Sequence, residues 1–216
     1  MGFDNKYLEK VRKIGRKVVL PSDEIKGILE SSIDFECVES VCDFGAGSLF
    51  WSEYFAEKLG GNRVDSTAIN MGGGQNELNR KVFAIDSIYK TYRPKCVFSN
   101  IALNADIFST LQQQRFDLIF VSDVFHHLDS VNLDKIFSAF CAHGAKFIII
   151  KDIDATHRFG DLMNKAHDLL INGEKVHSIF PQKLQMRLES SGFKCRYFYL
   201  PKLWYPHFLL IAQRKI

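Results

Sequence analysis

The chain alternates short apolar runs with segments of helical periodicity from residue 38 to its end. Two of the runs, Phe116–Ser122 (FDLIFVS) and Lys146–Lys151 (KFIIIK), are mostly apolar, which is typical of strands buried on both faces. Such strands in alternation with helices predict an α/β fold, a doubly wound and mostly parallel sheet with helices on both faces. The predicted strands are Val38–Asp43, Val82–Asp86, Cys96–Phe98, Phe116–Ser122, Lys146–Lys151, Lys194–Leu200 and His207–Gln213, and the predicted helices between them include Phe50–Leu59, Val131–Ala142 and Pro181–Ser190.

Three other segments complete the expected organisation. The link between the last two strands, residues 201–206, is too short for a parallel crossover, so the last strand is predicted to be antiparallel. Residues 60–80 are rich in glycine and asparagine, and a loop of this length either closes over a ligand or is a surface insertion. At 216 residues the chain fits one domain, 1–216, which opens with a helical segment over residues 1–37.

Composition and charge argue against several classes of protein. Hydrophobic residues make up 46% and charged residues 25%, a balance typical of globular domains. The net charge of +3 is too small to indicate nucleic-acid or membrane binding by itself. No segment resembles a signal peptide, and no apolar run approaches the ~18 residues that span a membrane. The five cysteines form no CxxC pair, and Cys42, Cys96 and Cys141 lie in apolar runs. We therefore expect buried free thiols in a cytoplasmic protein.

A glycine-containing corner follows the first predicted strand. Asp43 ends that strand, and Gly45-Ala46-Gly47 precedes a helix. Open parallel sheets bind ligands beyond the carboxyl ends of their strands, and the first N–H groups of the following helix point at such a ligand. A dinucleotide site prefers G-x-G-x-x-G, but Phe50 takes the third glycine position. The corner therefore predicts a ligand site of another kind.

The pattern Asp43-x-Gly45-x-Gly47 resembles the first motif of the class I S-adenosylmethionine-dependent methyltransferases, although Leu49 replaces the family's last glycine. The segments VFAID, NADIF, FDLIFVSDVFHHLD, KFIIIKDID and LESSGF resemble later parts of that family in the same order. The resemblance, from residue 38 to 216, implies a Rossmann-like seven-stranded sheet and S-adenosylmethionine as cofactor. The cofactor-binding residues that it implies are Asp43, Phe44, Gly45, Ala46, Gly47, Asp86, Asp106, Ile107 and Ser122.

The acceptor has to be inferred from other features, because this fold serves many acceptors. Ser122-Asp123-Val124-Phe125 lacks the prolines found in enzymes that methylate the amino groups of bases, and no cysteine has the proline context of cytosine C5 methylation. We therefore expect a small molecule or saccharide, methylated at oxygen. Polar residues spaced along HRFGDLMNKAHDLL suit such an acceptor, and Trp204 and Tyr205 are expected on the ligand side to stack on a ring.

Two alternatives to this function remain open. The basic residues near the amino terminus leave RNA methylation as one, although the sequence shows no RNA-binding module and nucleic acid is not the expected partner. The other is a non-catalytic cofactor-binding subunit that supports a partner enzyme.

The base that takes the acceptor's proton is predicted among four residues. His126 and His127 follow the fourth strand, and the resemblance favours His127. His167, in the loop after the fifth strand, is the main competitor, and Asp152 or Asp168 could orient the ring of either His127 or His167. Asp123 and Asp152 occupy places comparable to the ligands of metal-dependent relatives. Because Ile153 stands where those enzymes have asparagine, we expect no metal.

Overall fold

The structure is a computed structural model that describes residues 19–46, 50–59, 81–85, 115–172 and 175–215. A six-stranded sheet forms its centre, in the order β2-β1-β3-β4-β6-β5. The first four strands of this order are parallel, and β6 is antiparallel to both of its neighbours, as the short link predicted. The strands are β1 (Ser40–Phe44), β2 (Lys81–Ile85), β3 (Leu118–Ser122), β4 (Phe147–Ile153), β5 (Phe193–Lys202) and β6 (Tyr205–Arg214).

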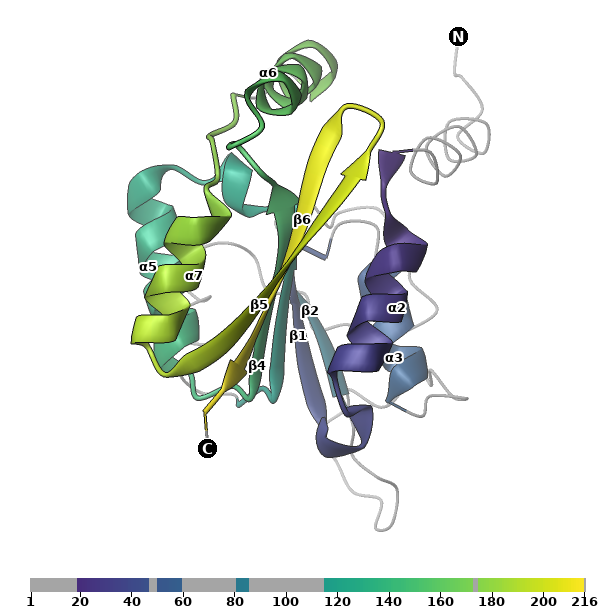
Figure 1. The fold of residues 1–216 in the computed structure, drawn as a ribbon. Helices are drawn as coiled ribbons and strands as arrows, with labels where there is room; N and C mark the ends of the chain where they lie inside the picture. Colours follow the sequence, from purple (N-terminus) through teal and green to yellow (C-terminus); the bar gives the residue numbers. More distant parts are fainter. Residues whose placement is uncertain (1–18, 47–49, 60–80, 86–114, 173–174, 216) are drawn as a thin grey trace, which may run out of the picture.

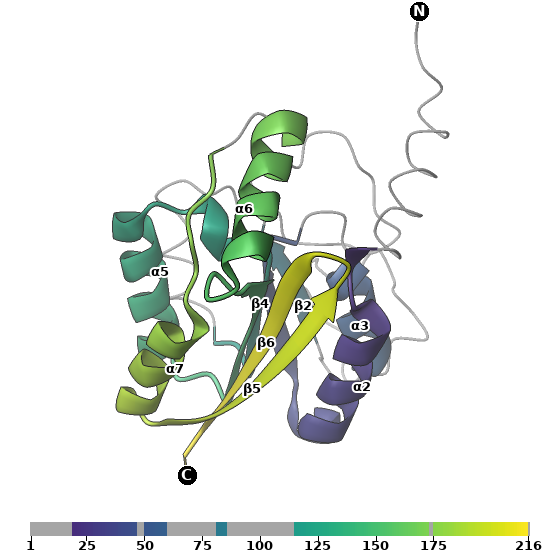
Figure 2. The same cartoon turned by 45° about the horizontal axis from the view of Figure 1, so that its top comes forward.

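Helices cover both faces of the sheet, which confirms the predicted doubly wound architecture (Figure 1). One face is covered by α2 (Ser22–Ser32) and α3 (Phe50–Lys58), and the other by α5 (Ser130–Ala142) and α7 (Pro181–Ser190). A further helix, α6 (Arg158–His167), lies beyond the end of β4. In Figure 2, where the top of the view in Figure 1 comes forward, α6 lies beside the ends of β4 and β6.

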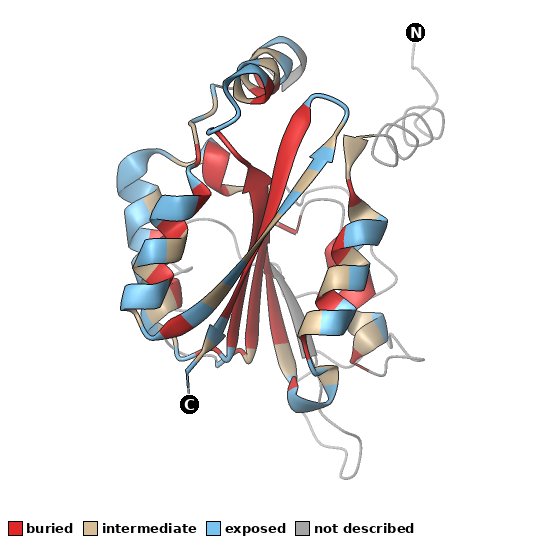
Figure 3. Cartoon of the chain, in the orientation of Figure 1, coloured by how far each residue is buried: buried red, intermediate tan, exposed pale blue. Residues whose placement is uncertain are grey.

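Two hydrophobic cores lie on opposite sides of the sheet because side chains alternate along each strand. In β3, Ile119 and Val121 face the core under α5 and α7, whereas Leu118 and Phe120 face the core under α2 and α3. The central strands are therefore buried along their length (Figure 3). β4 is buried at all seven positions, as expected for a strand covered on both faces.

Several sequence predictions fall outside the described residues. These are the third strand (Cys96–Phe98), the seventh strand that it would supply, the 60–80 insertion and the first half of the amino-terminal segment. Of the four cysteines that are described, all free, Cys42 is buried, Cys141 and Cys195 are half-buried, and Cys37 is exposed. No helix in the described ranges is long and apolar enough to cross a membrane.

Candidate active site

The carboxyl ends of β1, β3 and β4 meet at one edge of the sheet because the three strands are parallel. Asp43 of β1 lies opposite Phe120 of β3, and Ser122 at the end of β3 lies opposite Lys151 of β4. The turn between β5 and β6 lies at this same edge, as predicted, with α6 beside it (Figure 1). We call it the carboxyl edge, and it brings together the predicted site residues that the structure describes.

The tight corner after β1 makes room for a neighbouring residue of the fold. Gly45 has a φ of +75°, in the region that favours glycine. A Cβ on it would lie 2.0 Å from Cγ2 of Val124, in the loop after β3. A side chain at position 45 is therefore excluded by Val124 as well as by the backbone conformation.

The acid at the end of β1 is buried and joined to the following helix. Oδ2 of Asp43 accepts a hydrogen bond from Oγ of Ser52 in α3 at 2.5 Å. Phe44 points to the opposite face, where its ring packs edge-on against Phe140 at a centroid distance of 5.2 Å, so a ligand could meet only its backbone. Ala46 is buried as well. The other predicted cofactor residues except Ser122 lie outside the described part of the chain: Gly47, Asp86, Asp106 and Ile107.

A buried lysine is paired with an acid between β3 and β4. The side chain of Lys151 is 1% exposed, and its Nζ donates to both carboxylate oxygens of Asp123 at 2.5 Å. Burial opposes ionisation of Asp123, but the charge and hydrogen bonds of Lys151, together with the nearby rings of His207 and His126, outweigh burial and lower the pKa of the carboxyl group. Oγ of Ser122 also donates to this carboxylate, at 3.2 Å. The carboxylate is one-third exposed, so it can still accept a hydrogen bond from a ligand at the edge.

A second charged pair lies beside the first. Nδ1 of His126 is 2.5 Å from Oδ1 of Asp152, and both side chains are buried. Asp152 also accepts from the backbone N–H groups of Phe125, His126 and Ile153. Burial opposes the charge on His126, but Asp152 and the neighbouring acids Asp123 and Asp168 outweigh it and raise the pKa of His126 to about 9. His126 is thus an imidazolium near neutral pH and has no free lone pair for a base.

The other two candidate histidines are exposed. His127 ends the short 3₁₀ helix Phe125–His127, and its ring lies 4.2 Å from that of His126 between centroids. His167 ends α6, where its Nδ1 is 2.7 Å from the hydroxyl oxygen of Tyr205. Of the predicted histidines that are exposed, His127 is thus the one whose ring contacts His126 of the second charged pair.

A fourth histidine at this edge was not predicted. His207 is buried at the start of β6, and its Nε2 donates to the backbone oxygen of Val19 at 2.9 Å. Burial and the charge of Lys151 together lower the pKa of His207 to about 3. Its Nδ1 is buried and has no hydrogen-bond partner among the described residues. The ring is therefore neutral, with one acceptor nitrogen unused.

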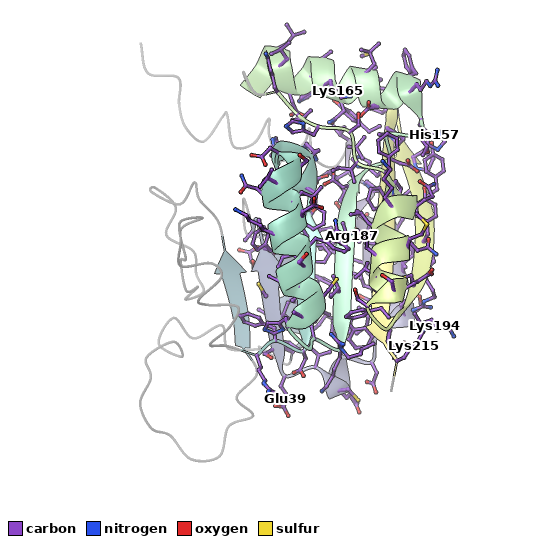
Figure 4. All side chains as sticks on the ribbon, turned by 90° about the vertical axis from the view of Figure 1, so that its left-hand side faces the viewer. Glu39, His157, Lys165, Arg187, Lys194 and Lys215 are labelled. Carbon is purple, nitrogen blue, oxygen red and sulfur yellow. The ribbon has the colours of Figure 1, made fainter. Side chains whose placement is uncertain are left out.

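Several polar residues of α6 and of the helical turn that follows it, Asp168–Asn172, face the fold. Asn164 and Asp168 are buried, and Nδ2 of Asn164 donates to Oδ2 of Asp168 at 3.1 Å. Oδ2 of Asp161 accepts from Oγ of Ser178 at 2.9 Å. His157 precedes the helix, is exposed and stacks on Tyr199 with ring centroids 4.4 Å apart. In Figure 4 its ring stands at the end of α6 beside the last strands. Asp161, Asn164 and Asp168 thus turn inward, whereas His157 is exposed.

Lys151 and His207 were not predicted as site residues from the sequence. A lysine that ends an otherwise apolar, buried strand is the one signal that could have identified Lys151. Asp123 and Asp152 were considered as metal ligands, and both accept hydrogen bonds from nitrogen donors in the structure. Within the described ranges no group of three His, Cys, Asp or Glu side chains is arranged to hold a metal ion.

Comparison with solved structures finds the same arrangement of strands and helices elsewhere. No protein-family model matches the sequence, and no curated protein does. A SAM-dependent methyltransferase from Archaeoglobus fulgidus superposes with a TM-score of 0.62 at 16% identity, covering 98% of this chain and 100% of that one. Magnesium protoporphyrin IX methyltransferase (ChlM) from Synechocystis PCC 6803 with bound SAH gives 0.60 at 16% identity, covering 100% and 90%.

A third solved structure is longer than this chain. An O-methyltransferase family protein from Burkholderia thailandensis gives a TM-score of 0.60 at 11% identity, and the match covers 90% of this chain and 56% of that one. This chain therefore spans little more than half of the Burkholderia protein. At these identities the three similarities establish the fold and leave the chemistry to be argued from the site.

Proposed function

We propose that this chain, which has the fold of the class I S-adenosylmethionine-dependent methyltransferases, transfers a methyl group from S-adenosylmethionine to an oxygen atom of a small molecule or saccharide. The observation that carries the proposal is the position of two charged pairs, Lys151–Asp123 and His126–Asp152, at the carboxyl edge. That edge is where open α/β sheets bind their ligands. The three similar solved proteins are all named as methyltransferases, which supports the same class of reaction.

The residues at the end of β1 fit the cofactor. S-adenosylmethionine carries an ammonium group, and Asp43 supplies a buried carboxylate beside the corner that leads into α3. In the class I methyltransferases that the sequence resembles, residues in the positions of Asp86 and Asp106 bind the ribose and the adenine of the cofactor. We assign these roles to Asp86 and Asp106. When bound, the cofactor supplies a methyl group on a sulfonium, which is already a good leaving group.

The chain then has to hold the acceptor hydroxyl in line with that methyl group and remove its proton. Correct placement of the two reactants can lower the barrier by ~7–11 kcal/mol. We assign proton removal to His127, because it is exposed beside the charged pairs and because the unperturbed imidazole pKa of ~6.5 suits a base near neutral pH. His126 is a positioning residue, since its charge and its bonds to Asp152 fix the short helix that carries His127.

The surroundings of the edge favour a polar acceptor. The inward face of α6 presents Asp161, Asn164 and Asp168, whose oxygens and amide group match hydroxyl groups. Trp204 lies in the turn between β5 and β6 with 47% of its surface exposed, and its ring is available to stack on a sugar or an aromatic ring.

The test is a transfer assay with tritiated S-adenosylmethionine. The purified chain is incubated with a small-molecule extract, with a saccharide mixture, and separately with total RNA, and products are identified by their mass shift. Transfer to the extract or saccharides supports the proposal, and His127→Ala serves as the matched catalytic control. Transfer to RNA alone would favour RNA methylation. Cofactor binding with no transfer to any acceptor would favour a non-catalytic subunit.

A further inference from the structure

His207 holds a buried hydrogen-bond acceptor that the proposed mechanism does not use. The side chain is 3% exposed, near the start of β6. Its Nε2 lies 2.9 Å from the backbone oxygen of Val19, which can only accept, so the proton of the neutral ring is on Nε2. Nδ1 therefore carries a lone pair, and it has no hydrogen-bond partner among the described residues. Buried acceptors in proteins are nearly always paired, and leaving one without a donor is unfavourable.

The register of the sheet places His207 beside the pair formed by Lys151 and Asp123. His207 lies opposite Ile153 of β4, and Lys151 lies opposite Leu209, two residues further along β6. Residues related in this way are diagonal neighbours on one face of the sheet, about 7–8 Å apart. Nζ of Lys151 is bonded in turn to both carboxylate oxygens of Asp123, which is one-third exposed. The unused nitrogen thus lies in a cluster that extends to the surface of the carboxyl edge.

This cluster shares one face of the sheet with the acid that we assign to the cofactor. Side chains alternate along a strand, and Leu209 of β6 and Val41 of β1 both belong to the core under α2 and α3. His207 and Asp43 are each two residues from one of these, so they lie on that same face. Both are at the carboxyl edge, where β6 begins and β1 ends (Figure 1). A ligand lying across this face would extend from the cofactor end, at Asp43, toward the unused nitrogen.

The donor that completes Nδ1 has to be small and neutral. Nδ1 is shielded from solvent, which leaves room only for a small group. The ammonium group of Lys151 disfavours a second cation beside the ring. A hydroxyl meets both conditions and donates one hydrogen bond. Because the pKa of His207 is about 3, the ring does not take a proton from an attacking oxygen at neutral pH. The hydroxyl that it binds therefore keeps its proton and is not the one that reacts.

We propose that His207 determines specificity for the acceptor: its Nδ1 accepts a hydrogen bond from a hydroxyl group of the acceptor other than the one that is methylated. The acceptor is then a diol or polyol, in which one hydroxyl receives the methyl group and a neighbouring hydroxyl stays free. A site with a buried acceptor atom discriminates strongly against an analogue that lacks the matching donor. This inference rests on the proposed function, since it concerns the acceptor of that reaction.

Two substitutions separate the two nitrogens of the ring. His207→Gln keeps a nitrogen donor for Val19 at the place of Nε2 and removes the acceptor at the place of Nδ1. His207→Asn keeps an oxygen acceptor at the place of Nδ1 and loses the bond to Val19. Transfer from saturating S-adenosylmethionine is measured against a dilution series of the saccharide mixture and of the small-molecule extract. Thermal unfolding of each variant measures its stability separately.

The proposal predicts that the apparent KM for the acceptor rises about tenfold in His207→Gln, with kcat nearly unchanged, and rises less in His207→Asn. The stabilities should rank the other way, because only His207→Gln keeps the bond to Val19. An equal rise of KM in both variants, or a fall in kcat at unchanged KM, would overturn the proposal, because His207 would then act through the fold alone.

Nitrogen-15 NMR of the full chain, labelled in its histidines, tests the lone pair without any methyl transfer. The Nδ1 resonance of His207 is assigned by its loss in His207→Gln, and it shifts when the nitrogen accepts a hydrogen bond. The chain is titrated with ethylene glycol and separately with 1,2-dimethoxyethane, which has the same skeleton and no donor, each with and without S-adenosylhomocysteine. The proposal predicts a shift with ethylene glycol alone.

A resonance that already shows a hydrogen bond in the free chain would overturn the proposal, because a bound water would then complete Nδ1. The same response to both probes, or no response to either, would also overturn it. A shift with ethylene glycol in a chain that transfers no methyl group would support the hydroxyl site and contradict the proposed function. Methyl transfer with the same KM in the parent and both variants would do the reverse.

Discussion

Nζ of Lys151 lies 2.5 Å from both carboxylate oxygens of Asp123, while the backbone N–H of Asp123 donates to the backbone oxygen of Lys151 at 2.9 Å. Asp123 adopts a φ of 54° as it makes these contacts. The left-handed backbone turns the chain sharply after β3 and leaves the carboxylate beside the lysine. The two residues therefore join the ends of β3 and β4 at the point where we place the reaction.

Asp123→Asn should destabilise the fold by about 3 kcal/mol, because it leaves the buried ammonium group of Lys151 without its counter-charge. Adding Lys151→Met to the same chain should recover much of this loss, since the buried charge is then gone. Urea unfolding of the parent, the two single variants and the double variant measures both effects. If the two single losses simply add in the double variant, the side chains are not coupled as described.

The stability of the protein should fall as the pH rises from about 6.5 toward 9 and beyond. The folded-state pKa of His126, about 9, lies above its ordinary value near 6.5, so the folded protein binds this proton more tightly than the unfolded chain. The contribution is complete below pH ~6.5 and is lost as the pH passes about 9, with a total of up to about 3 kcal/mol. Chemical unfolding across this range should show the slope in the parent chain and a clearly smaller one in His126→Gln. An identical slope in both would contradict the assigned ion pair.

Gly45→Ala should cost more stability than Gly144→Ala, although both glycines have positive φ. At Gly144 an added Cβ meets nothing within 4 Å, so only backbone strain of roughly 1 kcal/mol is expected. At Gly45 the Cβ also strikes Val124, and overpacking adds roughly 1–3 kcal/mol. Thermal unfolding compares the two variants. Val124→Ala introduced together with Gly45→Ala should restore part of the difference, and no restoration would show that the contact with Val124 is unimportant.

His127→Ala should lower the turnover rate ~10²- to 10⁴-fold and leave cofactor affinity nearly unchanged, as expected for loss of a general base. His167→Ala is the matched comparison, because His167 is also exposed at this edge but is bonded to Tyr205. Steady-state rates with any acceptor found in the transfer assay decide between them. Loss of turnover in His167→Ala alone would move the base to α6. Normal rates in both variants would mean that placement of the acceptor suffices.

Most of the fold could be predicted from local sequence patterns. Strands buried on both faces, such as β3 and β4, are apolar at nearly every position and stand out from the helices around them. The end of β5 was harder to predict. That strand continues to Lys202, with Pro201 of β5 opposite Pro206 of β6 at the edge of the sheet. Prolines in a sequence normally indicate that a strand has ended.

The candidate site was only partly predictable, because its contacts join residues far apart in the chain. Val124 occupies the Cβ position of Gly45 because the pairing of β1 with β3 brings the ends of the two strands together. No sequence motif indicates this contact. Asp152 was predicted as a partner for the ring of His127 or His167, whereas the structure joins it to His126. The further bonds of Asp152 to three backbone N–H groups, which tie the loop after β3 to β4, depend on tertiary structure.

The central claim is that this chain binds S-adenosylmethionine across the carboxyl ends of its parallel strands. Calorimetric titration of the parent chain and of Asp86→Ala with S-adenosylmethionine tests it most directly, with Asp23→Ala, on the outer surface of α2, as the control. The account predicts saturable binding by the parent and the control, and ~10- to 150-fold weaker binding by Asp86→Ala, through loss of charge-assisted hydrogen bonds to the ribose. No binding by the folded parent chain, or equal affinity in Asp86→Ala, would contradict it.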